Sequence, residues 1–180
     1  MKSSYKNEIN YGLLFQQLCF MTEPKRIIEI GILEGFSLKQ FCNICSKDCK
    51  IHAYDIFDKF NGNRANYKNI IEMFKEQENI TIEYGDFYDV HEKLSENTVD
   101  IIHIDIANNG DVYKYAIENY LPKLTKNGIM ILEGGSVERD NIEWMNKYNK
   151  PKINTYLKSL DLSYITLGKI PSLTLIKPRN

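Results

Sequence analysis

Residues 26–37 read RIIEIGILEGFS, and this stretch is the strongest indication of the fold in the sequence. Its first five residues form a short apolar run ending in glycine, which predicts a buried strand. The turn that follows, from Glu29 to Gly35, has the pattern acid-x-Gly-x-x-x-Gly and leads into helical spacing. Glycines let the backbone bend sharply and approach a ligand, while a helix start offers free N–H groups. The stretch therefore predicts a ligand site where a buried strand ends.

Strands and helices alternate through the rest of the chain. An amphipathic helix is expected over 4–21, stopped near Pro24, ahead of the first strand. Such alternation favours a mostly parallel sheet with helices on both faces, which binds ligands at the carboxyl ends of its central strands. The other expected strands are 51–54, 80–84, 99–105 and 128–132, the helices 36–45, 63–77 and 111–124, and the terminal hairpin 163–167 with 173–177.

Length and composition limit the function classes. A chain of 180 residues has room for one core, so we expect a single domain over 1–180, with a helical segment at 1–24 and a cofactor-binding core at 25–180. The net charge is −1, and a chain without a basic region is not expected to bind nucleic acid or anionic membranes. No apolar run approaches the roughly 20 residues of a membrane span, and no cleavable leader is recognised. We expect a cytoplasmic protein.

The four cysteines allow two interpretations. Cys42, Cys45 and Cys49 stand at i, i+3 and i+7, which suits either a metal or iron–sulfur site or one apolar stripe of a helix. We favour the stripe, because free cysteine packs as a small hydrophobe. With Cys19 they could form disulfides in an oxidising compartment, but without a leader we expect thiols.

Acidic groups follow each of the first three strands. Asp55 ends the second strand, 24 residues after Gly31, where a carboxylate can accept both hydroxyls of a ribose. Gly85-Asp86-Phe87 ends the third, where a carboxylate can accept from an adenine amino group and a ring can contact the base. The first turn departs from G-x-G-x-x-G, which weakens a dinucleotide assignment. Three such groups on successive strands predict a cofactor that contains adenosine.

With these motifs the chain resembles the class I S-adenosylmethionine-dependent methyltransferases, and within them the small O-methyltransferases of the macrocin and catechol type. The resemblance covers residues 26–178 and includes VDIIHID at 99–105 and NGIMIL at 127–132. It implies a Rossmann-like α/β fold with a seven-stranded, mostly parallel sheet, an antiparallel last strand and helices on both faces.

The resemblance also implies a cofactor site. Gly31 and Gly35 would border the methionine part of the cofactor, Asp55 would hold the ribose, and Asp105 would lie at the reaction centre. The expected cofactor contacts are Glu29, Gly31, Gly35, Ser37, Asp55, Ile56, Asp86, Phe87 and Asp105.

The part played by a metal stays open in the sequence. In metal-using relatives, the aspartate equivalent to Asp105 binds magnesium together with an aspartate-asparagine or aspartate-aspartate pair after the fifth strand. A histidine often follows the first aspartate closely. Here Glu133-Gly134-Gly135 replaces the pair, and Asn108 stands near the expected histidine. Asp105 and Glu133 would give magnesium two oxygen ligands, to be completed by waters and substrate. Without a metal, either could be a general base or orient the acceptor. For His103 we expect a buried, hydrogen-bonded role.

Contacts to the methyl acceptor are expected after the fourth and fifth strands. Arg139 follows two glycines and could turn inward, where a guanidinium suits phosphate or carboxylate better than an ammonium does, although a solvated loop is equally open. Asn108 and Tyr113 are further candidates. Trp144 and Tyr148 could contact a sugar or a planar ring, but such spacing also suits a core.

The resulting hypothesis is methyl transfer from S-adenosylmethionine to a small molecule, at an oxygen of a sugar, glycan precursor or natural product, with an anionic acceptor among the options. One alternative is an NAD-type oxidoreductase, which the glycine spacing disfavours. Another is a methyltransferase-like protein that binds cofactor without turnover, suggested by the sequence at Glu133-Gly134. Relatives of this compact type often pair, so a homodimer is also expected.

Overall fold

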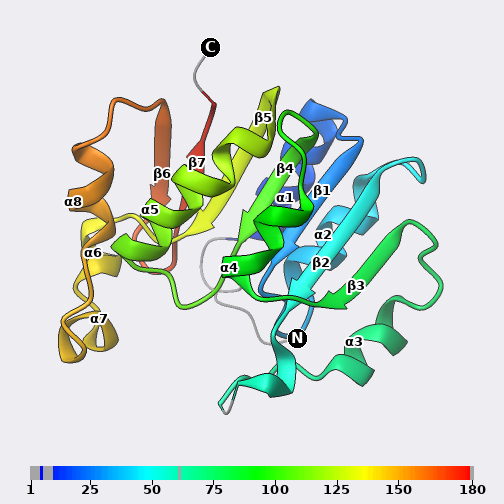
Figure 1. The fold of residues 1–180 in the computed structure, drawn as a ribbon, viewed down its shortest axis with the longest axis horizontal. Coiled ribbons are helices and arrows are strands. Elements are labelled where there is room, and N and C mark those ends of the chain that lie inside the picture. Colours follow the sequence, from blue (N-terminus) through cyan, green and yellow to red (C-terminus); the bar gives the residue numbers. More distant parts are fainter. Residues whose placement is uncertain (1–4, 6–9, 61, 179–180) are drawn as a thin grey trace.

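A seven-stranded sheet runs through the computed structural model, which describes residues 5, 10–60 and 62–178 (Figure 1). The strand order is β3-β2-β1-β4-β5-β7-β6. Strands β3 to β5 pair in parallel, and β7 is antiparallel to both neighbours. This confirms the predicted fold class. The strands are β1 (Arg26–Ile30), β2 (Lys50–Asp55), β3 (Ile80–Tyr84), β4 (Val99–Ile104), β5 (Leu124–Glu133), β6 (Tyr164–Gly168) and β7 (Ser172–Ile176).

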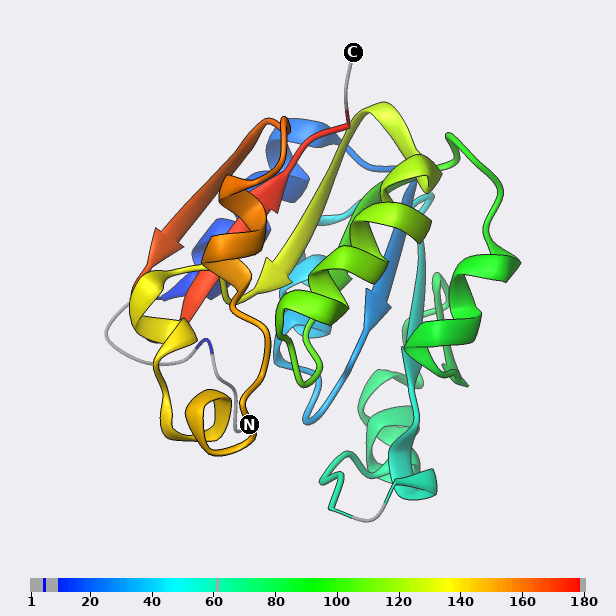
Figure 2. The same cartoon turned by 60° about the vertical axis from the view of Figure 1, so that its left-hand side comes forward.

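Helices cover both faces of the sheet, as Figures 1 and 2 show. Side chains alternate between the faces of a strand, so Ile27 packs with α1, α2 and α3 while Ile28 packs with α4, α5 and α8. None of the helices in the described residues is long and apolar enough to cross a membrane. The helices are α1 (Tyr11–Thr22), α2 (Phe36–Ile44), α3 (Tyr67–Phe74), α4 (Phe87–Val90), α5 (Gly110–Asn119), α6 (Val137–Asp140), α7 (Glu143–Lys147) and α8 (Ile153–Lys158), with 3-10 turns η1 (Phe57–Lys59), η2 (His91–Lys93) and η3 (Leu121–Lys123).

Several element boundaries differ from the predictions, two of them because asparagine side chains cap the helices. The side chain of Asn10 accepts from the Gly12 backbone N–H, so α1 begins at Tyr11. The predicted start of this helix, at residue 4, lies outside the described residues. The side chain of Asn66 likewise starts α3, which is shorter than the predicted 63–77. Strand β5 begins four residues before the predicted 128, at an irregular register with β4.

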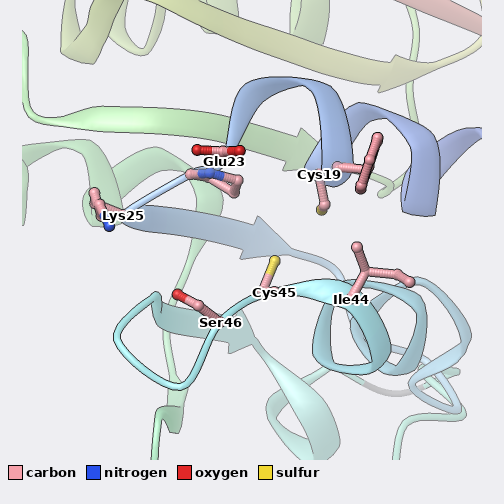
Figure 3. A pocket seen from close by; sticks show the side chains of 8 residues that line it. Cys19, Glu23, Lys25, Ile44, Cys45 and Ser46 are labelled. Atoms are coloured by element: carbon pink, nitrogen blue, oxygen red, sulfur yellow. The ribbon is translucent and has the colours of Figure 1, made fainter.

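The cysteines lie near the amino end of β1, away from the strand ends that carry the predicted site. Cys19 and Cys45 face each other across a pocket of about 280 Å³ (Figure 3). All four are free thiols, as expected, and a hydrogen bond with Cys19 raises the pKa of Cys45 to about 12. Helix α2 ends before Cys45, so Cys49 is not on its stripe but is buried in the same core. Among the described residues, no His, Cys, Asp and Glu side chains group as a metal site.

Candidate active site

Three predicted site residues meet at the carboxyl ends of β1, β2 and β4: Gly31, Asp55 and Asp105. Because these strands are parallel neighbours, the Gly31 N–H donates to the Tyr54 carbonyl at 2.9 Å, and the Asp105 N–H donates to the Ile30 carbonyl at 2.9 Å. Gly31 has φ +89°, and a Cβ there would lie 2.0 Å from the Asp105 carbonyl oxygen. Only glycine lets the two loops approach this closely.

Asp55 joins two loops of the site. Its Oδ2 accepts from the N–H groups of Ile32 at 2.7 Å and Leu33 at 3.4 Å. Its Oδ1 accepts from the Phe57 N–H at 2.8 Å and from Asn63 Nδ2 at 2.7 Å. With both oxygens engaged, Asp55 fixes the glycine turn.

Glu29 and Ser37 lie buried beneath this turn. The Ser37 hydroxyl donates to Glu29 Oε1, and His103 Nδ1 is 3.5 Å from the same oxygen. Glu29 Oε2 has no hydrogen-bond partner among the described residues. Gly35 caps α2 with φ +75°. A buried carboxylate oxygen without a partner is costly, so this position suits a cationic ligand group.

A second pocket, of about 480 Å³, lies at the carboxyl ends of β2 and β3. It includes two predicted cofactor residues, Ile56 and Asp86. Phe87 is not part of its wall: the ring is buried and stacks on Tyr120, with centroids 5.3 Å apart and planes at 12°. The ring of Phe87 is therefore packed in the core, and the lining of this pocket gives no support to the predicted contact of Phe87 with adenine. The pocket is lined by Ile56, Lys59, Phe60, Tyr84, Gly85, Asp86, Asp89, Val90 and Lys93.

Tyr5 is a site residue that the sequence reasoning missed. It is 1% exposed, its hydroxyl lies 3.1 Å from His103 Nε2, and its ring meets Phe15 edge-on. Burial, together with the charges of Asp105 and Glu133, raises the pKa of Tyr5, which also hydrogen-bonds Asp105. A single tyrosine before a helix has no distinguishing pattern in a chain with twelve tyrosines. The structure gives His103 the buried, hydrogen-bonded role that was expected.

Glu133 and Arg139 form a buried ion pair. Arg139 Nε donates to Glu133 Oε1 at 2.6 Å, and Nη2 donates to Oε2 at 2.9 Å. Arg139 has turned inward, as one interpretation proposed, but its charge is matched by Glu133. Burial raises the pKa of Glu133 to about 7, with Asp105 adding to the rise and Arg139 opposing it.

Asn108 and Tyr113 support the backbone of Glu133. Asn108 Nδ2 donates to the Glu133 carbonyl at 2.8 Å, and the Tyr113 hydroxyl donates to it at 3.1 Å. Both side chains are fully buried, so their expected role as direct acceptor contacts is replaced by a structural one. The centroid of the Trp144 ring lies 6.0 Å from Arg139 Cζ, whereas the Tyr148 side chain is exposed on the surface.

The described residues do not fit the magnesium ion that the resemblance left open. Both oxygens of Glu133 already accept hydrogen bonds from a guanidinium. A cation would meet the positive charge of Arg139 there, and Asp105 would be the one predicted carboxylate left to bind it.

The fold and the strand-end site define the class: a class I S-adenosylmethionine-dependent methyltransferase. A family model described as "Methyltransferase domain" matches residues 28–133, more than half of the chain. The chain belongs to this methyltransferase-domain family. Comparison with curated proteins gives no match.

Solved structures share the fold at low sequence identity. The O-methyltransferase from Bacillus cereus, in complex with SAH, is 17% identical with a TM-score of 0.70, over 98% of this chain and 84% of that one. SAH-bound PaMTH1 from Podospora anserina is 16% identical with a TM-score of 0.69, over 97% and 80%. TomG from Streptomyces achromogenes, in complex with SAM, is 14% identical with a TM-score of 0.68, over 97% and 82%.

Proposed function

We propose that this protein transfers the methyl group of S-adenosylmethionine to a hydroxyl oxygen of a small molecule. The observation that carries the proposal is the meeting of Gly31, Asp55 and Asp105 at the carboxyl ends of adjacent parallel strands. The oxygen acceptor is supported by the structural neighbours, two of which are named as O-methyltransferases, with tomaymycin synthesis given for one.

The residues of the site fit the parts of this cofactor. The partnerless Glu29 Oε2 can accept from its ammonium group, and the Asp55 carboxylate can accept from its ribose hydroxyls. The pocket beside Ile56 and Asp86, about 480 Å³ in volume, has room for the adenine. These assignments use the predicted residues, except that Phe87 packs in the core and is given no contact with the cofactor.

Asp105 is the proposed catalytic residue. When bound, S-adenosylmethionine supplies a methyl group on a sulfonium, which requires an oxygen held in line with the carbon–sulfur bond. Asp105 would orient the acceptor hydroxyl and take its proton as the oxygen–carbon bond forms and the methyl carbon–sulfur bond breaks, which leaves the neutral thioether of the demethylated cofactor. The Tyr5 hydroxyl, whose raised pKa keeps it protonated, would donate to Asp105 and hold the carboxylate in place. Glu133, paired with Arg139, would shape the site without taking the proton.

For the acceptor we favour a neutral hydroxyl compound, such as a sugar, glycan precursor or natural product. Glu133 matches the charge of Arg139, which argues against the anionic acceptor that a free guanidinium would favour. Arg139 Nη1 has no hydrogen-bond partner among the described residues and could donate to the oxygen of such a hydroxyl. Two further predictions concern the whole protein. One is a cytoplasmic location, which the four free thiols support. The other is a homodimer.

The proposal can be tested with S-adenosylmethionine labelled in its methyl group and a panel of neutral sugars, nucleotide sugars and phenols. The wild type should label at least one neutral hydroxyl compound, and Asp105→Asn should reduce the rate about 100-fold or more because the proton acceptor is lost. Cofactor binding without transfer to any compound would favour the alternative of a binding protein without turnover. Transfer to acidic compounds alone would contradict the neutral acceptor.

A further inference from the structure

Glu133 is held at both its backbone and its side chain. Its carbonyl accepts from Asn108 Nδ2 and the Tyr113 hydroxyl, and its carboxylate accepts two N–H groups of Arg139. The Glu133 and Arg139 side chains are only 7% and 9% exposed. The carboxylate therefore cannot turn toward another ligand without breaking a buried, two-point ion pair.

Arg139 is equally fixed from the other side. The Ser136 hydroxyl accepts from the Arg139 N–H at 2.9 Å and donates to the Lys169 carbonyl at 2.6 Å. In the next position, Asp140 accepts from the Ile153 N–H at 2.9 Å. Helix α6 is thus tied to its surroundings at both ends, so the guanidinium is positioned before any ligand arrives.

The ion pair lies next to the proposed reaction centre. The charge of Asp105 raises the pKa values of both Glu133 and Arg139, so the three charged groups interact. Two carboxylates and one guanidinium leave a single net negative charge there when all are ionised. A pair of carboxylates with no cation of the protein's own would instead repel each other and attract a divalent metal.

We propose that Arg139 is a built-in cation that occupies Glu133, so that methyl transfer at Asp105 proceeds without a divalent metal. Arg139 is then a positioning residue: it neutralises Glu133 and leaves Asp105 to orient the acceptor. This inference rests on the proposed function for its chemistry, but it makes a separate statement about metal binding. Removing the guanidinium should release both carboxylate oxygens of Glu133, which can then bind a hard cation together with Asp105.

Mn²⁺ provides a probe for this statement, because its free form is measured directly by electron paramagnetic resonance. The wild type should take up no more Mn²⁺ than Asp105→Asn does, and its affinity for S-adenosylmethionine and any transferase activity should be unchanged after chelation. Arg139→Ala should gain one Mn²⁺ site per chain, and Glu133→Gln added to that variant should remove the site. A merely structural arginine would not produce this gain.

The inference is overturned if the wild type takes up Mn²⁺ at a site that Asp105→Asn abolishes, or if chelation lowers its activity and Mg²⁺ restores it. It is also overturned if a folded Arg139→Ala variant takes up no more Mn²⁺ than the wild type. Should that variant unfold, Arg139→Met is measured in its place, and the wild-type measurements need no variant of Arg139. A wild type that binds no S-adenosylmethionine would refute the proposed function alone, leaving the Mn²⁺ result intact.

Discussion

At the scale of single residues, the site depends on side chains that are held before a ligand binds. Asp55 accepts four hydrogen bonds from two loops, and Glu133 is held by three side chains. The sequence could place Asp55, Asp105 and Glu133 at strand ends, because strand ends follow from the hydrophobic pattern. It could not show that Arg139 pairs with Glu133, or that Tyr5 reaches Asp105. Both contacts depend on how loops cross in space.

Asp55→Ala should weaken S-adenosylmethionine binding by about 1 to 3 kcal/mol through loss of charge-assisted hydrogen bonds. The same change frees the N–H of Ile32 and so loosens the glycine turn. Titration calorimetry of the folded variant measures the effect. Asp48→Ala, at an exposed position, is the control and should bind as the wild type does. Equal affinity of both variants would remove Asp55 from the cofactor site.

Tyr5→Phe should lower the rate of methyl transfer about tenfold, the equivalent of one hydrogen bond of about 1.4 kcal/mol to Asp105. Cofactor affinity should stay the same, because the hydroxyl acts at the reaction centre. Tyr11→Phe is a matched control, since its hydroxyl donates to the carbonyls of Leu167 and Pro171 instead. If both variants keep the wild-type rate in steady-state assays, Tyr5 has no part in the reaction.

At the scale of elements, the turn between β1 and α2 is the part that the sequence predicted most directly. The apolar run of β1 and the glycines at 31 and 35 are local features, and they reappear as a buried strand and two left-handed residues. Helices α4, α6, α7 and α8 have four to six residues each. Such lengths are too short for a periodic pattern, and tertiary packing decides whether they form.

Gly31→Ala should reduce the free energy of unfolding by at least about 2 kcal/mol, because the new Cβ would combine backbone strain with a clash. That atom would lie 2.0 Å from the Asp105 carbonyl oxygen. Gly62→Ala is a sharp control: Gly62 also has a positive φ, +109°, but its nearest neighbour, in the ring of Phe60, is 4.0 Å away. Urea unfolding that shows equal losses for the two variants would mean that close approach at Gly31 is unimportant.

At the scale of the whole molecule, one sheet brings together groups that are far apart in the chain. Tyr5, Asp105 and Glu133 interact although they come from the start, middle and later part of the sequence. The alternation of strands and helices sufficed to predict a mostly parallel sheet with a ligand site at the carboxyl ends of its central strands, whereas the antiparallel last strand was predicted from the family resemblance. The poor fit of a magnesium ion follows from the buried ion pair of Glu133 and Arg139, which the sequence pattern does not reveal.

The pKa of Glu133 predicts a pH dependence of global stability. A carboxyl whose pKa rises from 4.5 to about 7 on folding binds its proton more tightly in the native state. Between these values the free energy of unfolding should therefore fall as pH rises, by about 1 to 3 kcal/mol in total. Urea unfolding at pH 5 and pH 8 measures this fall. In Glu133→Gln the fall should be smaller by that amount, and an identical pH profile would show that Glu133 titrates normally.

Calorimetric titration of the wild type measures whether the strand-end site binds S-adenosylmethionine. We expect one molecule of S-adenosylmethionine or its demethylated product to bind per chain, with no comparable binding of NAD. Tighter binding of NAD, or no binding of either form of the sulfur cofactor by the folded protein, would contradict this expectation.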